Sequence, residues 1–430
     1  MARPEQTAKR ACAGGQAVGG DGVDRLSALP DGLLHAVLSF LPAPQVVRTC
    51  VLSRRWRRLW RSAPRVNVDE LDLGITVPCS RGDLEARWGR FEDFADNLLL
   101  FHDSTSSLGE FRYSSHLYNP RQVDRWVRRG IEYCPAVLEI QTYSFSEHRR
   151  FKLPPVAASS LHRLKTLRLS NVNLGSNFTD LLCSGCPFLE DLEFCCCDFY
   201  GNCSQGITVA SPTLNKLVMN CCKDNTSHPL VITAPSLVYL RLHFGCYKNG
   251  ISLHKMDSLV TASIYIDENQ TFTEKNQREL LGSLFNLTRL ELLGFETEVM
   301  MLSDKPDKCP IFCNMRTLYL YGCFLDEYDL NEKLEALGCF LHNAPFLEKL
   351  TLERCMFMSF SDSEWEIERK NITLQHQDKK TFQCPKLKLV EVMYEYDHDH
   401  QLIELLWNLG KSLPDANIKL TKKLIWLQLP

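Results

Sequence analysis

The chain has 430 residues, with 49 lysines and arginines against 52 aspartates and glutamates, for a formal net charge of −3. This near-neutral balance excludes a global electrostatic attraction to nucleic acid or to an anionic membrane surface. No apolar run approaches the roughly 20 residues that a membrane-spanning helix needs, so we expect no membrane contact. The length predicts a large core and more than one folded unit.

The first segment, residues 1–22, reads MARPEQTAKRACAGGQAVGGDG. It lacks the apolar stretch of a secretory signal, and its glycine and alanine content predicts a flexible leader. Without such a signal we expect a reducing compartment, cytoplasmic or nuclear, in which disulfides are disfavoured. The 19 cysteines are therefore expected to be mostly free thiols.

An amphipathic helix is predicted next. Apolar residues recur there at i, i+1, i+4, i+5 and i+8, which is helical spacing; they are Leu33, Leu34, Val37, Leu38 and Leu41. Two prolines, Pro42 and Pro44, end this helix and begin a short linking piece. With the helix that follows, three pieces in about 40 residues build only a small core. We therefore expect this module to bury further apolar surface against a partner.

A second amphipathic helix lies in VLSRRWRRLWRSAP, where Ser53 is placed to cap it. At 100° per residue, one sector about 100° wide holds Leu52, Trp56, Leu59 and Trp60. Five arginines occupy the opposite side and fit either phosphate contacts or a solvated face. Two tryptophans carry much apolar area that must be buried, which favours docking on protein over reading nucleic acid.

Helical spacing also marks residues 84–102 and 122–134, and we assign Trp126 to a core. We expect these two helices to cover the first units of the region that follows and to cap its open end.

A short motif recurs along most of the remaining chain. Its form is L-x-x-L-x-L, as in LKTLRL, and its starts are separated by 22 to 40 residues. Eleven copies begin at residues 108, 137, 164, 189, 214, 237, 259, 287, 315, 347 and 387. This period and core are typical of leucine-rich repeats. Each copy predicts a short strand with one apolar face, and stacked copies predict an α/β solenoid with a parallel sheet on its concave side.

The repeat explains at least seven cysteines as small buried hydrophobes. They lie eight residues after or three residues before a repeat start: Cys197, Cys222, Cys323 and Cys355, and Cys134, Cys186 and Cys384. The single C-x-x-C at 183–186 has no second pair to complete a zinc site, and we predict no metal and no cofactor. Cys195 and Cys196 are left without a structural explanation.

Two elements are predicted near the C-terminal end. The charged stretch at 356–384 predicts a surface insertion. A helix that would close the far end of the solenoid carries one apolar stripe, formed by Leu402, Leu405, Leu406 and Leu409.

The stretch DRLSALPDGLLHAVLSFLPAPQVVRTCVLSRRWRRLW is very similar to the F-box of plant F-box/leucine-rich-repeat proteins. The segments RFEDFADNLLL, LLCSGCPFLEDLEF and APFLEKLTLERC continue the resemblance, and the last part resembles the FBD-type extension of that family. The resemblance implies, after the leader, a small all-α F-box module at 23–63. It further implies a solenoid with capping helices at 64–383 and an FBD-like repeat or cap at 384–430.

The resemblance also implies a function in which this chain is not itself an enzyme. The F-box docks a Skp-family adaptor, which joins a cullin and a RING protein in a ubiquitin ligase, and the repeats hold an unidentified target protein. The chain then contributes proximity and orientation to ubiquitin transfer. The implied adaptor contacts are Leu29, Pro30, Leu33, Leu34, Val37, Leu38, Leu41, Val46, Val47, Val51, Trp56 and Trp60. Some of these must form the core of the module instead, and the sequence does not divide them.

The candidate target surface is the solvent face of the predicted sheet, two, four and six residues after each repeat start. Central repeats place tyrosine and arginine there, which are enriched at interface hot spots, although aromatic residues also pack across strands. The candidate target contacts are Tyr239, Arg241, His243, Tyr265, Arg289, Tyr319 and Tyr321.

Three other functions compete with this interpretation. An enzyme would be expected to carry a recognisable motif, and neither a Gly-rich phosphate loop nor G-x-S-x-G nor H-E-x-x-H occurs. Nucleic-acid binding through the arginines predicts an affinity that falls steeply with salt, and the tryptophan stripe argues against it. A scaffold that uses the F-box outside a ligase would need the same surface as a ligase subunit.

Overall fold

The computed structural model describes residues 26, 28–73, 81–103, 108–116, 119–143, 150–175, 177–200, 206–247, 249–265, 273–295, 311–324, 330–355, 382, 384–394 and 399–422. The chain forms two compact units, Met1–Ala63 and Pro64–Pro430. The predicted leader at 1–22 and nearly all of the predicted insertion at 356–384 lie outside the described residues.

The N-terminal unit is built from short helices. Proline precedes each of the first two helices, where its fixed φ suits a helix start. The elements are α1 (Asp31–Leu38), α2 (Ala43–Arg48), the 3-10 turn η1 (Thr49–Val51), α3 (Trp56–Leu59) and the 3-10 turn η2 (Trp60–Ser62). Their small common core consists of Leu34, Leu38, Trp56 and Leu59, with Leu29 and Val46 packed against it and partly buried.

The predicted second helix is shorter than expected. The chain makes the turn η1 first, and the helix begins only at Trp56, whose amide donates to Ser53 Oγ at 3.4 Å as the predicted cap. The expectation that Leu52 lies on the buried stripe is wrong, because it precedes the helix and is 61 % exposed. The other three members of the predicted stripe, Trp56, Leu59 and Trp60, are buried.

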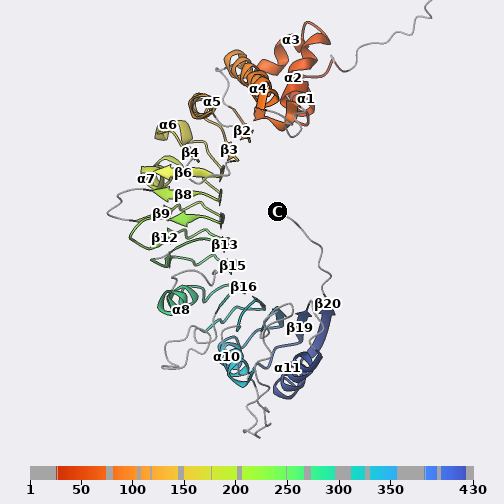
Figure 1. The fold of residues 1–430 in the computed structure, drawn as a ribbon, viewed down its shortest axis with the longest axis vertical. Coiled ribbons are helices and arrows are strands. Elements are labelled where there is room, and N and C mark those ends of the chain that lie inside the picture. Colours follow the sequence, from red (N-terminus) through yellow and green to blue (C-terminus); the bar gives the residue numbers. More distant parts are fainter. Residues whose placement is uncertain are drawn as a thin grey trace, which may run out of the picture. The chain divides into compact units, whose positions relative to one another are not determined.

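The second unit is dominated by one large parallel sheet. Among the described residues the sheet contains thirteen strands, which follow one another in chain order (Figure 1). They are β1 (Arg65–Asp69), β2 (Glu110–Ser115), β3 (Val137–Thr142), β5 (Thr166–Ser170), β7 (Asp191–Cys195), β10 (Lys216–Asn220), β13 (Tyr239–His243), β15 (Thr261–Tyr265), β16 (Arg289–Leu293), β17 (Thr317–Tyr321), β18 (Lys349–Glu353), β19 (Leu389–Tyr394) and β20 (Asn417–Lys422).

Each of the eleven predicted repeats contributes one strand, β2 to β19 of this sheet, and the leucine-rich-repeat solenoid is confirmed. The flanking strands β1 and β20 follow no copy of the motif. The second copy begins two residues earlier than predicted, because Leu138 pairs with Phe111 of β2 and with Leu167 of β5.

The side of the solenoid that faces away from the large sheet carries helices and two small sheets (Figure 1). The helical elements are η3 (Leu71–Leu73), α4 (Arg81–Phe101), α5 (Pro120–Glu132), α6 (Ala158–Leu161), α7 (Asn177–Gly185), α8 (Glu274–Gly282), α10 (Leu330–His342) and α11 (Asp399–Ser412). One small sheet contains β4 (Phe151–Lys152), β6 (Val172–Gly175), β8 (Asp198–Tyr200) and β11 (Lys223–Asp224); the other contains β9 (Thr208–Ala210), β12 (Leu230–Thr233) and β14 (Ile251–His254).

The predicted helices at 84–102, 122–134 and 402–409 are confirmed as α4, α5 and α11. Trp126 is 1 % exposed and packs its ring against Phe91, as expected of a core residue. Along α11, Leu405 and Leu409 are buried and Leu406 is half-buried, whereas the side chain of Leu402 lies outside the described residues.

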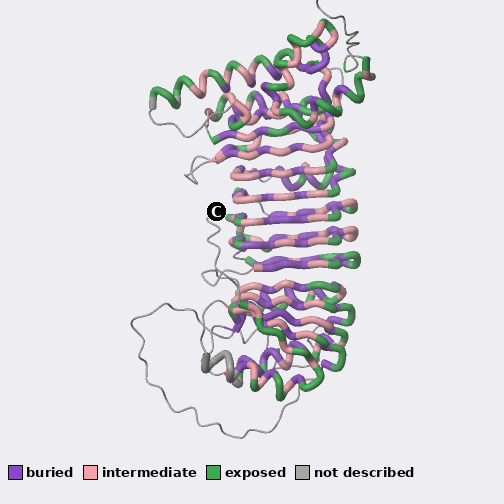
Figure 2. Tube along the Cα trace, turned by 90° about the vertical axis from the view of Figure 1, so that its right-hand side faces the viewer, coloured by how far each residue is buried: buried purple, intermediate pink, exposed green. Residues whose placement is uncertain are grey.

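Burial alternates along the strands, as the motif predicts (Figure 2). Inward leucines of neighbouring strands stack in register, so each repeat covers the apolar edge of the next. The residue that follows a strand often has a positive φ, as in Asn171, Cys196, Cys221 and Phe244, and this turns the chain off the sheet.

The predicted cysteine positions are largely confirmed. All four cysteines at the inward turn are buried, and each thiol donates to a backbone carbonyl of the preceding strand, for example Cys197 to Leu169 at 3.3 Å and Cys355 to Leu320 at 3.2 Å. Cys186 and Cys384 are also buried. The expectation fails for Cys134, which is only half-buried, because the second copy begins two residues earlier and Cys134 therefore does not occupy the equivalent position.

Candidate docking surfaces

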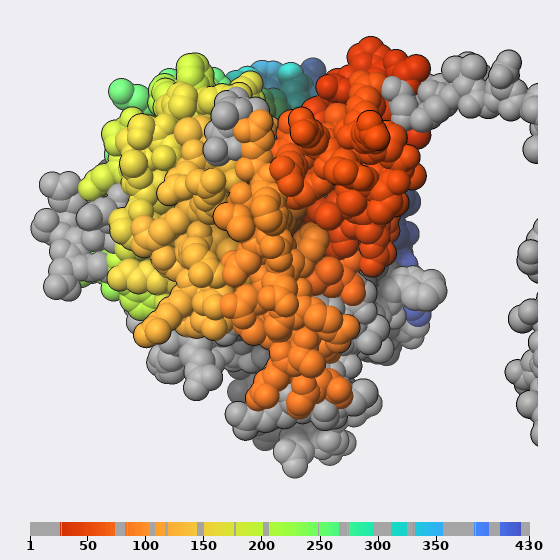
Figure 3. Space-filling model, turned by 90° about the horizontal axis from the view of Figure 1, so that it is seen from above, coloured from red at the N-terminus to blue at the C-terminus, as the bar shows by residue number. Residues whose placement is uncertain are grey.

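The N-terminal unit exposes several large apolar side chains. On α1, Leu33 is 54 % and Val37 is 43 % exposed, and their i, i+4 spacing puts them on one face of the helix. Phe40 follows the helix and is 85 % exposed. Figure 3 shows one face of this unit in red. The exposed apolar residues of the unit are Leu26, Leu33, Val37, Phe40, Leu41, Val51 and Leu52.

The structure divides the candidate adaptor contacts by burial. Leu34, Leu38, Trp56 and Trp60 are buried, so their first role is to hold the helices together. The half-buried members are Leu29, Val46 and Val47, and the exposed members are Pro30, Leu33, Val37, Leu41 and Val51. Phe40 and Leu52 join the exposed set, and neither was among the candidates. Phe40 was missed because it falls outside the apolar spacing of the predicted helix.

Polar contacts fix the orientation of α1 against α3. Arg55 forms an ion pair with Asp31 in the first turn of α1, and His35 Nε2 lies 3.2 Å from both the Leu59 carbonyl and Ser62 Oγ. These contacts leave the apolar face of α1 uncovered within the unit. The remaining arginines of the segment are exposed, as a solvated face requires.

The candidate target contacts lie on adjacent strands of the large sheet. Tyr239, Arg241, Tyr265, Tyr319 and Tyr321 are half-buried, and Arg289 is the most open. His243 is different, because it is only 7 % exposed. Burial, together with the neighbouring charge of Arg241, lowers its pKa to about 4, so the imidazole is neutral near pH 7.

His243 is the centre of a chain of hydrogen bonds across three strands. Arg241 Nη2 lies 3.3 Å from His243 Nδ1, and His243 Nε2 lies 2.8 Å from Ser263 Oγ. Ser263 Oγ in turn donates to Glu291 Oε2 at 2.8 Å. Because a guanidinium only donates, Nδ1 must accept and the proton of the neutral ring must sit on Nε2.

The direction of these hydrogen bonds has a chemical consequence. In a serine nucleophile the hydroxyl donates to the imidazole that removes its proton. Here Ser263 accepts from His243 and gives its own proton to Glu291. The arrangement therefore orients side chains on the sheet surface and does not activate a serine.

The hydroxyls of Tyr319 and Tyr321, both on β17, form hydrogen bonds with the last residue of β18 and with the residue after it. Tyr319 Oη donates to Glu353 Oε2 at 2.5 Å, and burial followed by this contact raises the pKa of Tyr319 above its ordinary value. Arg354 Nη1 donates to Tyr321 Oη at 2.9 Å. The surface is thus a fixed pattern of aromatic and charged groups, which lowers the entropy lost on binding a partner.

In the part of the chain that the structure describes, no three His, Cys, Asp or Glu side chains lie close enough to hold a metal ion. No helix in the described ranges has both the length and the apolar character needed to cross a bilayer. Cys183 of the C-x-x-C is exposed while Cys186 is buried.

Comparison with known proteins gives consistent matches. Residues 26–66 match the model of the F-box domain. The chain is 32 % identical to the rice MEIOTIC F-BOX protein MOF (Oryza sativa subsp. japonica), over 91 % of this chain and 84 % of that protein. It is 27 % identical to an F-box/FBD/LRR-repeat protein of Arabidopsis thaliana, over 86 % of this chain and 84 % of the relative.

A third relative, an F-box/LRR-repeat protein of Arabidopsis thaliana, is 27 % identical over 77 % of this chain and 92 % of its own length. The names of all three relatives mention an F-box, and those of the two Arabidopsis thaliana relatives also mention LRR repeats, which are the two kinds of unit described above. A chain that shares this much sequence with them, and that folds its repeats into such a solenoid, belongs to the plant F-box/FBD/LRR-repeat proteins.

Proposed function

We propose that this chain is the substrate-recognition subunit of a Skp–cullin–F-box ubiquitin ligase. Its F-box would dock a Skp-family adaptor, and through that adaptor a cullin and a RING protein, while the solenoid would hold a target protein. The observation that carries the proposal is the uncovered apolar face of α1 on a module that matches the F-box domain. Such a face on a soluble module is typical of a protein interface.

The burial pattern supports two separate roles for the apolar residues of the module, core packing and adaptor binding. The buried residues Leu34, Leu38 and Trp56 hold α1 against α3. Leu33 and Val37, which each precede one of these buried leucines on α1, would then insert into the adaptor. In the proposed complex, Phe40, Leu41, Val51 and Leu52 surround this centre and exclude water from it.

The proposed contribution to ubiquitin transfer is geometric. A target bound to the solenoid is held near a conjugating enzyme carried by the cullin and RING protein, so the local concentration of target lysines rises. No reactive side chain of this chain is needed for that role. The hydrogen-bond direction at Ser263 is compatible with it.

The first experiment measures adaptor binding to the full-length chain. Leu33→Asp together with Val37→Asp places two charges in the proposed interface and is expected to lower the affinity at least about 100-fold. Both side chains are exposed, so the thermal unfolding midpoint should stay within a few degrees of wild type. The matched control is Phe188→Asp, a similarly exposed apolar residue of the solenoid unit, which should keep full affinity.

Recovery of cullin and of ubiquitylated proteins with wild type, and their loss with the double variant, would support the ligase. Adaptor binding without cullin would favour the scaffold alternative. A folded wild-type chain that binds no Skp-family adaptor would overturn the proposal.

We also propose that the solvent face of β13 to β17 contacts the target, through Tyr239, Arg241, His243, Tyr265, Arg289, Tyr319 and Tyr321. Arg289 and Tyr239 are used for the test because neither contacts His243 or Ser263 in the chain of hydrogen bonds, although Arg289 pairs with Glu291 at the end of that chain. Arg289→Ala with Tyr239→Ala should reduce target capture about tenfold or more while adaptor binding is kept. Lys275→Ala, on the exposed side of α8, serves as the control, and unchanged capture in the double variant would exclude this surface.

A further inference from the structure

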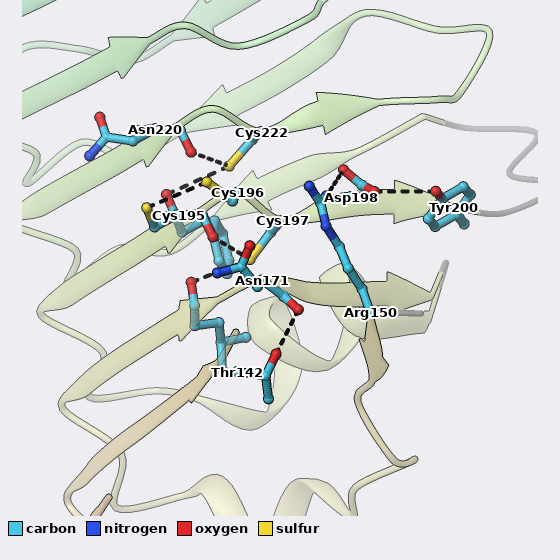
Figure 4. A network of polar contacts seen from close by, with 12 residues as sticks. Thr142, Arg150, Asn171, Cys195, Cys196, Cys197, Asp198, Tyr200, Asn220 and Cys222 are labelled. Atoms are coloured by element: carbon cyan, nitrogen blue, oxygen red, sulfur yellow. Dashed lines mark hydrogen bonds and ion pairs between the residues drawn. The ribbon is translucent and has the colours of Figure 1, made fainter. Parts of the chain in front are cut away.

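A group of cysteines lies at one edge of the large sheet, where β7 and β10 end (Figure 4). Cys195 is the last residue of β7, Cys196 follows it, and Cys221 follows β10. Cys195 and Cys196 are half-buried and Cys221 is exposed, so solvent reaches the group. The repeat motif assigns them no packing role, in contrast to the buried Cys197 and Cys222 beside them.

Cys196 and Cys221 occupy equivalent places in neighbouring repeats. Cys195 pairs with Asn220 in the register of the two strands, and the residue after each strand has a φ of 51° in one case and 52° in the other. The ladder continues past the strands, because the Cys196 amide donates to the Asn220 carbonyl at 2.7 Å. The two Cα atoms are therefore held near the strand spacing of about 4.8 Å.

The distance between the Cα atoms decides which pairs of thiols are able to form a disulfide. A disulfide needs Cα atoms about 4.4–6.8 Å apart, and neighbouring parallel turns satisfy this. Consecutive residues across a trans peptide are only about 3.8 Å apart, so Cys195 and Cys196 are poorly placed to bond to each other, although their sulfurs lie 3.9 Å apart. Cys221 is the better partner for Cys196.

The surroundings favour the thiolate of Cys196. Cys195 Sγ lies within hydrogen-bond distance of the Cys196 sulfur, and the positive charge of Arg150 lies nearby, although Asp198, the ion-pair partner of Arg150, opposes part of this effect. These contacts, the hydrogen bond with Cys195 first, hold the pKa of Cys196 below its ordinary value. A thiolate beside a protonated thiol is the arrangement of a reactive cysteine and its resolving partner.

We propose that Cys196 and Cys221 form a peroxide-sensitive pair that closes into a disulfide between two repeats. In the first step the Cys196 thiolate attacks hydrogen peroxide, an S–O bond forms as the O–O bond breaks, and the released hydroxide takes up a proton as water. In the second step Cys221 attacks the sulfenic acid, the S–S bond forms, and a second water leaves. Two thiols and one peroxide thus give one disulfide and two waters. A cellular dithiol then reduces the disulfide to two thiols and becomes a disulfide itself.

The test treats the reduced full-length protein with hydrogen peroxide, blocks free thiols and maps the peptides by mass spectrometry. We expect a loss of two hydrogen masses and a link between Cys196 and Cys221. In Cys221→Ser, the sulfenic acid at Cys196 should persist and be trapped by dimedone. In Cys195→Ala, the same disulfide should form more slowly, because the hydrogen bond between Cys195 and the Cys196 sulfur is lost.

The exposed Cys313 provides the internal reference. At pH 7, Cys196 should be alkylated at least about tenfold faster than Cys313, since the thiolate is the reacting species. Equal rates, a link between Cys195 and Cys196, or a link to any other cysteine would overturn the proposal. Thermal unfolding of the Cys195 and Cys221 variants checks that the fold is kept.

Discussion

The N-terminal unit and the solenoid bury their apolar side chains to different extents. On α1, buried Leu34 and Leu38 alternate with exposed Leu33 and Val37. On the central strands of the solenoid the inward leucines are completely covered, as at Leu290 and Leu318. The small unit has too few residues to cover its own helices, whereas every repeat is covered by the next. The face of α1 is therefore exposed because the unit itself has nothing to cover it, and in the proposed complex a partner would cover it.

The largest expected effect comes from removing the centre of the small core. Trp56→Ala should destabilise the N-terminal unit by about 3–5 kcal/mol, because Trp56 is 2 % exposed and packs against Leu34 and Leu38. Hydrogen exchange of the α1 amides in the full-length chain should accelerate strongly. Trp407→Ala, which removes a tryptophan that is 63 % exposed on α11, should leave exchange nearly unchanged. Protection retained in the first variant would show that the core is elsewhere.

A comparable change inside the solenoid should remain local. Leu318 is fully buried on β17 between β16 and β18, so Leu318→Ala should cost about 2–4 kcal/mol. Because repeats contact their neighbours, faster hydrogen exchange is expected in β16 to β18, with β2 and β3 little affected. Uniform acceleration over the whole solenoid would contradict this and indicate a single cooperative unit.

The hydrogen-bond chain at His243 predicts a pH dependence. The folded pKa of His243 is lowered to about 4, below its ordinary value of 6.5, so the unfolded chain takes up the proton first as pH falls. The contribution to stability is complete above pH 6.5 and is lost between pH 6.5 and about 4, by about 3 kcal/mol. His243→Gln should remove this part of the pH dependence in chemical unfolding. His254→Gln, at an exposed histidine, should not.

The smallest expected effect lies at the last strands. Glu391 on β19 contacts Lys349 Nζ on β18 at 2.9 Å and Lys419 Nζ on β20 at 3.0 Å, and these contacts lower its pKa to about 2. A lowered carboxyl pKa stabilises the fold above the ordinary value near 4.5, and this is lost as pH falls toward 2. Glu391→Gln should cost less than about 1 kcal/mol at pH 7. The difference from wild type should vanish near pH 2 in acid unfolding.

Much of the solenoid was predictable because its information is periodic. The spacing of leucines placed eleven strands and even the inward cysteines, since identical positions in successive repeats meet the same neighbours. The flanking strands β1 and β20 were not found, because they pair by position in the sheet and carry no copy of the motif.

The candidate sites were less predictable, for two physical reasons. In the F-box, the sequence pattern predicts that Leu52 belongs to the second helix, but the chain turns there instead. Which apolar residues of the module are buried and which are exposed therefore follows only from the structure. On the sheet, His243 is hydrogen-bonded to Ser263 of the next strand, and Ser263 is hydrogen-bonded to Glu291 of the strand after it. Such cross-strand partners emerge only from the register, which also brought Cys196 beside Cys221.

The uniform parallel register of the solenoid has a consequence for how such proteins diversify. Because each strand pairs with the next in the same register, an additional repeat inserted by gene duplication would keep every inward leucine facing inward. Each gained or lost copy would lengthen or shorten the exposed sheet by about 4.8 Å. The reach of the surface can therefore evolve in discrete steps while the docking module at the N-terminus stays unaltered.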